Sequence, residues 1–221
     1  MNSTELREPP SADTEDQIEL LFPIPLMRSP KLLGPDLIEA AIGSIRNAKV
    51  EHNLRSEQLF HTDIANPLDS NLFQQIAAAA VPKLKEFGFM LFGEELNWTV
   101  KEMWTNMLEK GGSQTLHAHA NSFISGVFYL TPSHPGCHTV FVRPPGGYDF
   151  SFRHHTRETA MGPINAGKYM LPTAEPGDLV LFPSYLYHEV PRNLGEQRIT
   201  IAFNAIPDRL NCWGYEIKFS G

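Results

Sequence analysis

Three histidines in the second half of the chain could form a metal site. His117 and His119 form an H-x-H pair just before the apolar segment FISGVFYL. On a strand, residues i and i+2 point to the same face, so both imidazoles could ligate one ion. His188, in the segment PSYLYHEV, could supply a third nitrogen. Divalent iron, copper and zinc all accept imidazole ligands. An H-x-H pair taken alone is more often two surface or hydrogen-bonded histidines.

An arginine follows the third histidine at a short distance. Arg198 lies ten residues after His188 and begins the segment RITIAFN. Thr200 is two residues further on and shares the same strand face. A guanidinium binds a carboxylate through two parallel hydrogen bonds, so the pair suits a small carboxylate ligand. A salt bridge on a barrel surface is the alternative reading of Arg198.

The elements that must position these residues are short strands. Segments rich in strand formers cover residues 98–108, 123–130, 138–142, 178–182 and 198–204, with turn signals between them. This spacing predicts an all-β barrel or sandwich. The long, turn-rich insertion at 143–171 is typical of a lid or binding loop.

The N-terminal part is different in character. We expect a disordered acidic tail over 1–17. An extended or edge-strand segment follows over 18–27, where Pro23 and Pro25 exclude a central strand. Helical periodicity predicts a helix that begins near Pro35. A second helix is capped by Asp69 or Ser70, and Pro82 is expected to kink it. Helical support at 18–95 and a β core at 96–221 then form a single domain over 18–221.

Composition excludes several classes of protein. The 221 residues are 42% hydrophobic, enough for a sizeable core, and carry a net charge of −7. Because the first 20 residues hold six acids and one base, the remainder is near neutral, so neither nucleic acid nor a membrane is an expected partner. No apolar run is long enough for a transmembrane helix, and the acidic N-terminus does not read as a signal peptide. Two cysteines form no disulfide scaffold, which favours the cytoplasm. An oligomer is compatible with the sequence but not indicated.

Residues 111–204 resemble the double-stranded β-helix core of the Fe(II)/2-oxoglutarate-dependent dioxygenases. The resemblance rests on LHAHANSFISGVFYL, EPGDLVLFPSYLYHEV and EQRITIAFN. Within that superfamily the chain is most similar to a group of small oxygenases with the motif H-x-H-x-x-S-x-x-S-G-V-x-Y. The implied fold is α+β, mainly β: a jelly-roll, cupin-like core with supporting N-terminal helices.

The resemblance also implies roles for individual residues. His117 and His188 are the first and last metal ligands, and Arg198, helped by Thr200, binds the C5 carboxylate of 2-oxoglutarate. Tyr129 and, on weaker grounds, Asn106 are expected to contact the co-substrate. The implied cofactors are Fe(II), 2-oxoglutarate and dioxygen. The implied reaction is hydroxylation, desaturation or cyclisation of a small molecule, with release of succinate and CO₂.

Position 119 departs from the common pattern of that superfamily. The usual motif is H-x-D or H-x-E, whereas this chain has His119. Either the site is a three-histidine variant, in which the catalytic metal ligands are His117, His119 and His188, or another group completes it. Asp149 and Glu158 in the insertion are candidates for that group, while Glu189 is expected to point away from the site.

The insertion gives a hint about the substrate. Basic and aromatic residues are interleaved over 143–171. They would favour a substrate with an acidic group and an apolar body, such as an amino acid derivative. A solvated loop is the equal alternative.

Two other functions stay open. One is a cupin-like three-histidine dioxygenase that does not use 2-oxoglutarate, although the glutamate expected after G-x5-H-x-H is missing. The other is a degenerate oxygenase that only binds a ligand or partner. Cys137 is expected to be structural, and Trp98, Trp104 and Trp213 are expected in the core.

Overall fold

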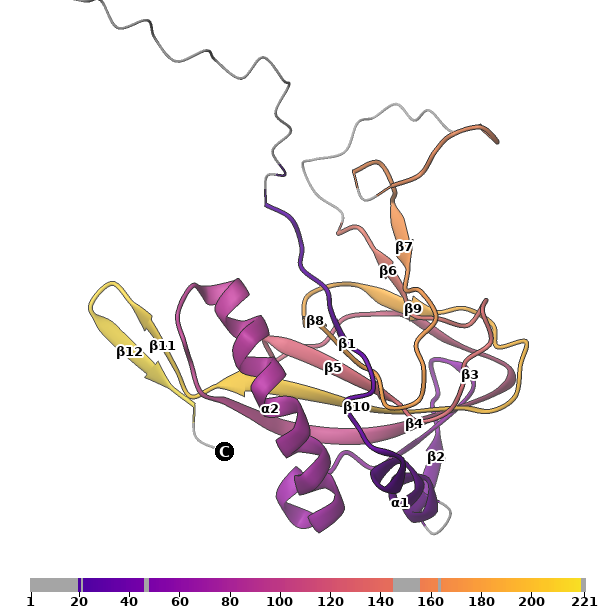
Figure 1. Cartoon of the computed structure of the whole chain (residues 1–221), viewed down its shortest axis with the longest axis horizontal. Helices are drawn as coiled ribbons and strands as arrows, with labels where there is room; N and C mark the ends of the chain where they lie inside the picture. The colour runs from indigo at the N-terminus through magenta and orange to yellow at the C-terminus, as the bar shows by residue number, and fades with distance from the viewer. Residues whose placement is uncertain (1–19, 21, 46–47, 145–155, 163, 220–221) are drawn as a thin grey trace, which may run out of the picture.

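The computed structural model describes residues 20, 22–45, 48–144, 156–162 and 164–219. Its strands form a curled antiparallel sheet in the order β1-β8-β5-β10-β4-β9-β6-β7, and β3 and β2 extend it from β4 (Figure 1). This confirms the predicted double-stranded β-helix. The strands are β1 (Met27–Ser29), β2 (Val50–His52), β3 (Glu57–Thr62), β4 (Trp98–His117), β5 (Ile124–Tyr129), β6 (Val140–Val142), β7 (Lys168–Met170), β8 (Leu179–Pro183), β9 (His188–Val190) and β10 (Arg198–Pro207).

Strand β4 belongs to both halves of the barrel. Its first part, as far as Leu108, pairs with β10 in the main sheet, and its last part, from Gln114 to His117, pairs with β9 in the smaller sheet. Between these parts lies Gly111 with φ +87°, a backbone conformation that residues other than glycine rarely adopt. Backbone hydrogen bonds with Asn193 on both sides of this point hold the bend. One strand therefore extends from the main sheet to the end of the smaller one, where it terminates at His117.

Two helices cover the outer face of the main sheet. Helix α1 spans Pro35–Ile45, and helix α2 spans Asn71–Phe92, with Ser70 as its N-cap and Gly93 in the left-handed conformation at its end (Figure 1). The apolar face of α2, which includes Ile76, Leu84 and Phe87, belongs to the main hydrophobic core together with outward-facing residues of β5 and β10. Neither helix has both the length and the apolar character needed to cross a membrane.

The N-terminal part is less helical than predicted. Residues 18–95 also contain β1, β2, β3 and a 3₁₀ turn at Pro67–Asp69. The edge strand expected within 18–27 occurs only at its end, where Met27 pairs with Leu181 of β8. Strand β3 was missed because its residues Glu57–Thr62 show no regular alternation, and its pairing with β4 supplies the missing stability. The helix α2 continues through Pro82.

Two hairpins extend beyond the barrel. In the first hairpin, β7 from the segment expected as a lid pairs with β6 (Figure 1). Residues 145–155 and 163 of that segment, and the expected tail over 1–17, lie outside the described residues. The second hairpin joins β11 (Arg209–Cys212) to β12 (Tyr215–Lys218). Trp213 at the tip of this hairpin is 98% exposed, so the expectation that it lies in the core was wrong. Trp98, in contrast, is buried in the main core.

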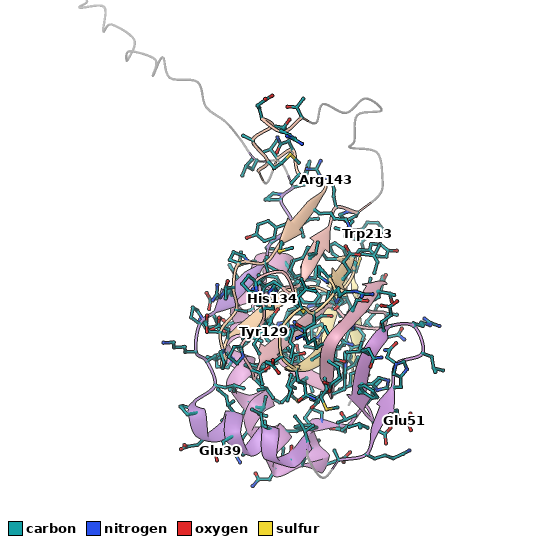
Figure 2. All side chains as sticks on the ribbon, turned by 90° about the vertical axis from the view of Figure 1, so that its right-hand side faces the viewer. Glu39, Glu51, Tyr129, His134, Arg143 and Trp213 are labelled. Atoms are coloured by element: carbon teal, nitrogen blue, oxygen red, sulfur yellow. The ribbon has the colours of Figure 1, made fainter. Side chains whose placement is uncertain are left out.

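The inner face of the main sheet is organised in rows that cross β4, β10 and β5. Cross-strand pairing aligns Asn106 with Thr200 and Tyr129, Trp104 with Ala202 and Val127, and Glu102 with Asn204 and Ser125. Directly paired residues project to the same side of a sheet. Tyr129 accordingly lies deep in the side-chain-filled interior, while Glu39 and Glu51 lie at the periphery (Figure 2).

Gly126 gives the first testable prediction. Its pairing partner is Phe203, and a Cβ at position 126 would lie 2.1 Å from the ring of Phe203. We expect Gly126→Ala to lower the free energy of unfolding by about 1–3 kcal/mol, because the buried ring must move. Urea denaturation measures this, and adding Phe203→Leu should recover part of the loss.

Gly43 is the matched control, since a Cβ there would meet nothing within 4 Å and the residue lies inside α1. Gly43→Ala should raise stability by about 0.5–1 kcal/mol. Equal effects of the two substitutions would contradict the close packing of Gly126 on Phe203.

Candidate metal and 2-oxoglutarate site

Three histidine side chains converge at the end of β4. His117 is the last residue of β4 and pairs with His188, the first residue of β9. One ring nitrogen from each of His117, His119 and His188 lies within 4.8 Å of the other two. The Nε2 atoms of His119 and His188 are 3.4 Å apart. Such a cluster of three nitrogens can hold one metal ion.

The structure corrects the reason given for the H-x-H pair. His119 lies in the loop after β4, so the alternation of side chains on a strand does not align it with His117. The loop instead brings the ring of His119 back toward His188, at a centroid distance of 5.2 Å and an interplanar angle of 7°. A backbone hydrogen bond of 2.9 Å from the N–H of His119 to the carbonyl of Ser184 holds it there.

Backbone carbonyls determine which nitrogens are available to a metal. The Nδ1 atom of His117 lies 2.8 Å from the carbonyl of Thr115, and that of His188 lies 3.0 Å from the carbonyl of Leu186. Because a carbonyl can only accept, each Nδ1 must carry the proton and each Nε2 keeps a lone pair. These contacts are the outer-shell hydrogen bonds that orient metal-binding histidines.

Burial keeps these imidazoles neutral. Burial and the neighbouring histidines lower the pKa of His188 to about 3. The pKa of His119 falls to about 4, mainly through burial and then through His117, against an opposing effect of Glu102. The pKa of His117 is also lowered by burial. Neutral imidazole is the form that binds a metal, so the cluster is ready for one at neutral pH.

A buried arginine lies in the same cavity. Arg198 is 4% exposed, its Nε has no hydrogen-bond partner, and its guanidinium lies 5.0 Å from the centre of the Tyr129 ring. Among the described residues no carboxylate pairs with it. A buried, unpaired guanidinium is costly, so an anionic ligand is the natural partner.

The cavity that contains these groups is narrow. Its free volume is about 20 Å³. Its lining combines the histidine cluster and the Arg198 guanidinium with amide, hydroxyl and aromatic groups. These are Trp104, Asn106, Gln114, His117, His119, Ser125, Thr139, Phe182, His188, Arg198 and Thr200, together with small and apolar residues.

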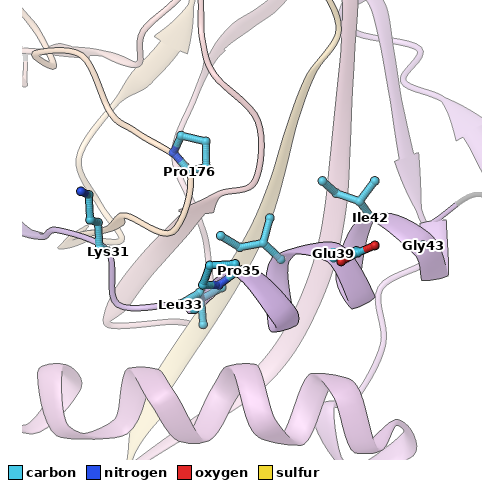
Figure 3. A pocket seen from close by; sticks show the side chains of 9 residues that line it. Lys31, Leu33, Pro35, Glu39, Ile42, Gly43 and Pro176 are labelled. Carbon is cyan, nitrogen blue, oxygen red and sulfur yellow. The ribbon is translucent and has the colours of Figure 1, made fainter.

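A larger hollow lies elsewhere, beside α1. It measures about 710 Å³ and is lined mainly by apolar residues such as Leu33, Ile38 and Ile42, with Lys31 and Glu39 as its charged members (Figure 3). None of its lining residues is a histidine or a cysteine. The chemistry of the residues, rather than the size of the hollow, therefore identifies the site.

A family model matches this part of the chain. Residues 102–204 match the family described as "Putative 2OG-Fe(II) oxygenase", and this segment includes all three histidines and Arg198. The barrel core is therefore similar to that of the Fe(II)/2-oxoglutarate-dependent oxygenases. A comparison with curated protein sequences finds no significant match.

Solved structures of this oxygenase fold resemble most of the chain. HygX from Streptomyces hygroscopicus, solved with nickel and 2-oxoglutarate, is 14% identical, with a TM-score of 0.60 and 83% of each chain covered. A Pseudomonas putida prolyl-4-hydroxylase is 15% identical, with a TM-score of 0.56 and 82% and 92% covered. The epimerase SnoN from nogalamycin biosynthesis is 13% identical, with a TM-score of 0.59 and 84% and 80% covered.

The cofactors of this oxygenase superfamily are Fe(II) and 2-oxoglutarate, and the residues present fit both. Three converging, neutral imidazole nitrogens that border one cavity fit a divalent metal. The unpaired guanidinium of Arg198 and the hydroxyl of Thr200, buried in the same cavity, fit a carboxylate.

The remaining predicted residues are distributed as follows. Asn106 lines the cavity. Tyr129 contacts Arg198 next to the cavity. Its hydroxyl forms a hydrogen bond of 3.0 Å with Thr139, and its ring makes a cation–π contact with the guanidinium of Arg198. Glu189 binds Lys168 at 2.6 Å. Glu158 is exposed and hydrogen-bonded to Thr156, so it is not in the cluster, and Asp149 lies outside the described residues.

Two residues that line the cavity were not identified from the sequence. Gln114 lies on β4 with its amide 3.5 Å from Nε2 of His117, and Trp104 lies against His119 at a ring distance of 5.7 Å. Extending the predicted strand from 108 to 117 would have identified Gln114. For Trp104, two-residue alternation with Asn106 was the available signal.

The neutral histidines predict a dependence of stability on pH. The unfolded chain binds protons on these residues near pH 6.5, whereas the native state does so only below about pH 4. With a chelator present, the free energy of unfolding should therefore decrease as the pH falls from 6.5 toward 4. Urea denaturation at several pH values measures this.

Replacing one buried histidine should weaken that dependence. The decrease should be shallower in His188→Gln, while the same substitution at the exposed His52 should leave the slope unchanged. An identical slope in wild type and His188→Gln would mean that His188 is not held neutral.

Proposed function

We propose that this protein is an Fe(II)- and 2-oxoglutarate-dependent oxygenase with a three-histidine iron site. His117, His119 and His188 would hold Fe(II), and Arg198 and Thr200 would bind the distal carboxylate of 2-oxoglutarate. The observation that carries the proposal is the shared cavity: a buried guanidinium without a partner lies in the same small space as three converging imidazole nitrogens.

The bound group supplies the oxidising chemistry: iron, 2-oxoglutarate and dioxygen together oxidise the substrate, and 2-oxoglutarate leaves as succinate and CO₂. The protein positions these partners. The backbone carbonyls of Thr115 and Leu186 orient the imidazoles of His117 and His188. The ring of Tyr129 packs against the guanidinium of Arg198. Buried apolar residues around the cavity, such as Phe141 and Phe182, exclude water.

We further infer that the substrate is a small molecule and that hydroxylation is the reaction. Desaturation or cyclisation would use the same residues. Gln114 and Asn106 present amide groups to the cavity, and Trp104 presents an aromatic surface. This combination suits a substrate with polar groups on an apolar body, such as an amino acid derivative.

A second candidate is a three-histidine dioxygenase that does not use 2-oxoglutarate. It is favoured by the ligand cluster, which contains no carboxylate among the described residues. In that case Arg198 would have no role in binding a co-substrate. The same experiment distinguishes the two.

The test is an anaerobic titration with Fe(II) and 2-oxoglutarate. Arg198→Met should weaken 2-oxoglutarate binding by about 30-fold or more, because a buried charge partner is lost, and should leave metal affinity within about threefold. His119→Ala should lose metal binding. Calorimetry and visible absorption measure both affinities.

The control is Arg192→Met, which removes an exposed arginine paired with Glu57. It should change neither affinity. Iron binding without 2-oxoglutarate binding in the wild type would favour the second candidate. Absence of iron binding would leave only a binding function.

A further inference from the structure

Glu102 places a carboxylate on the face of the main sheet that borders the cavity. Glu102 alternates along β4 with Trp104 and Asn106, which both line the cavity, so the three side chains share one face. Cross-strand pairing continues the row through Asn204 to Ser125, which also lines the cavity. Glu102 is thus the acidic end of a polar row beside the iron site.

Hydrogen bonds hold one oxygen of this carboxylate and leave the other free. Asn204 donates from Nδ2 to Oε1 at 2.7 Å, and Nζ of Lys101 lies 3.0 Å from the same oxygen. Oε2 has no hydrogen bond with any described residue. Burial opposes ionisation of Glu102, but the bonds from Asn204 and Lys101 outweigh it and lower its pKa. The group is therefore an ionised carboxylate with one available acceptor.

The same row is connected to His119. Ser125 donates to Oδ1 of Asn204 at 2.8 Å and lies 2.9 Å from the hydroxyl of Ser184. The carbonyl of Ser184 in turn accepts the backbone N–H of His119. These bonds connect the carboxylate of Glu102 to the loop that carries His119.

His119 and Glu102 both lie beside Trp104. The ring of His119 is 5.7 Å from that of Trp104, and Trp104 is two residues from Glu102 on the same face of β4. Glu102 therefore lies on the face of β4 against which this ligand packs.

The three ligands differ in their outer hydrogen bonds. His117 and His188 each donate from Nδ1 to a backbone carbonyl, whereas Nδ1 of His119 has no partner among the described residues. Metal-binding histidines almost always donate that proton, often to a carboxylate. His119 is also the ligand at the position where oxygenases with two histidines and one carboxylate carry the negative charge.

We propose that Glu102 is the positioning residue of His119, and that it supplies from outside the coordination sphere the negative charge that the three imidazoles lack. Its free Oε2 accepts the Nδ1–H of His119 when the metal holds the ring. Asn204, Ser125 and Ser184 hold this carboxylate in place. This inference rests on the proposed metal site.

The test compares metal binding in Glu102→Gln with that in Glu109→Gln. The substitution Glu102→Gln keeps the size of the side chain and an acceptor for Asn204 but removes the charge. We expect the affinity of this variant for Fe(II), measured anaerobically by competition with a chromophoric chelator, to fall about 10- to 100-fold. The midpoint potential of the bound iron should become more positive, because the negative charge of Glu102 stabilises the ferric state and the variant lacks it.

Glu109 is the matched control, since it lies on the same strand and binds Gln197 at the surface. Glu109→Gln should leave both quantities unchanged. A second variant, Glu102→Asp, keeps the charge on a shorter side chain. It should lose about three- to tenfold in affinity while its potential stays near that of the wild type.

The outcomes separate this inference from the proposed function. Failure of the wild type to bind Fe(II) would overturn the proposed function itself. If the wild type binds Fe(II) and Glu102→Gln binds it within about threefold, Glu102 has no part in positioning His119. A loss of stability in the metal-free variant with unchanged metal affinity and potential would assign Glu102 to strand pairing alone. If Glu102→Gln does not fold, wild-type metal affinity in Glu102→Asp would also overturn the proposal.

Discussion

The site depends on one strand that pairs with both halves of the barrel. β4 contributes Glu102, Trp104 and Asn106 to the main sheet and ends at His117 in the smaller sheet. The positive φ of Gly111 allows the strand to turn between them, and the antiparallel register then places His117 opposite His188. Without this shared strand, the buried arginine on β10 and the histidines on β9 and β4 would belong to separate surfaces. The barrel closure and the metal cluster are thus consequences of the same pairing.

The cavity is built from groups that do not stabilise the fold. Arg198 is buried without a carboxylate partner, and three imidazoles are held neutral against their ordinary pKa. Each of these costs free energy in the absence of ligands, because burial disfavours charge and crowded nitrogens cannot all be satisfied. The apolar cores on both faces of the main sheet offset this cost. Such local conflicts are expected at functional sites, and here they coincide with the groups that fit iron and a dicarboxylate.

The motif serines have a structural explanation. Ser122, Ser125 and Ser184 form a chain of hydroxyl hydrogen bonds of 2.9 Å, and Ser184 also holds the backbone of His119. His119 is not on a regular strand, so its position depends on this network rather than on a ladder. Gly126, the next residue of the motif, makes room for Phe203 on the opposite face. One short segment therefore organises both the ligand loop and the packing of the sheet on α2.

Local patterns in the sequence were sufficient for the barrel core, both helices and the candidate cluster. Apolar segments bounded by turn residues predict strands, helical spacing after Pro35 and Ser70 predicts α1 and α2, and residue types such as histidine and arginine indicate their own chemistry. Irregular β3, the reach of β4 to His117 and the exposure of Trp213 depend on contacts between distant segments, which no local pattern contains. For the same reason only the tertiary structure decided that His119 reaches the cluster from a loop. It also decided that Gln114 and Trp104 line the cavity and that Glu102 pairs with Asn204, because sheet register brings residues far apart in the sequence onto one face.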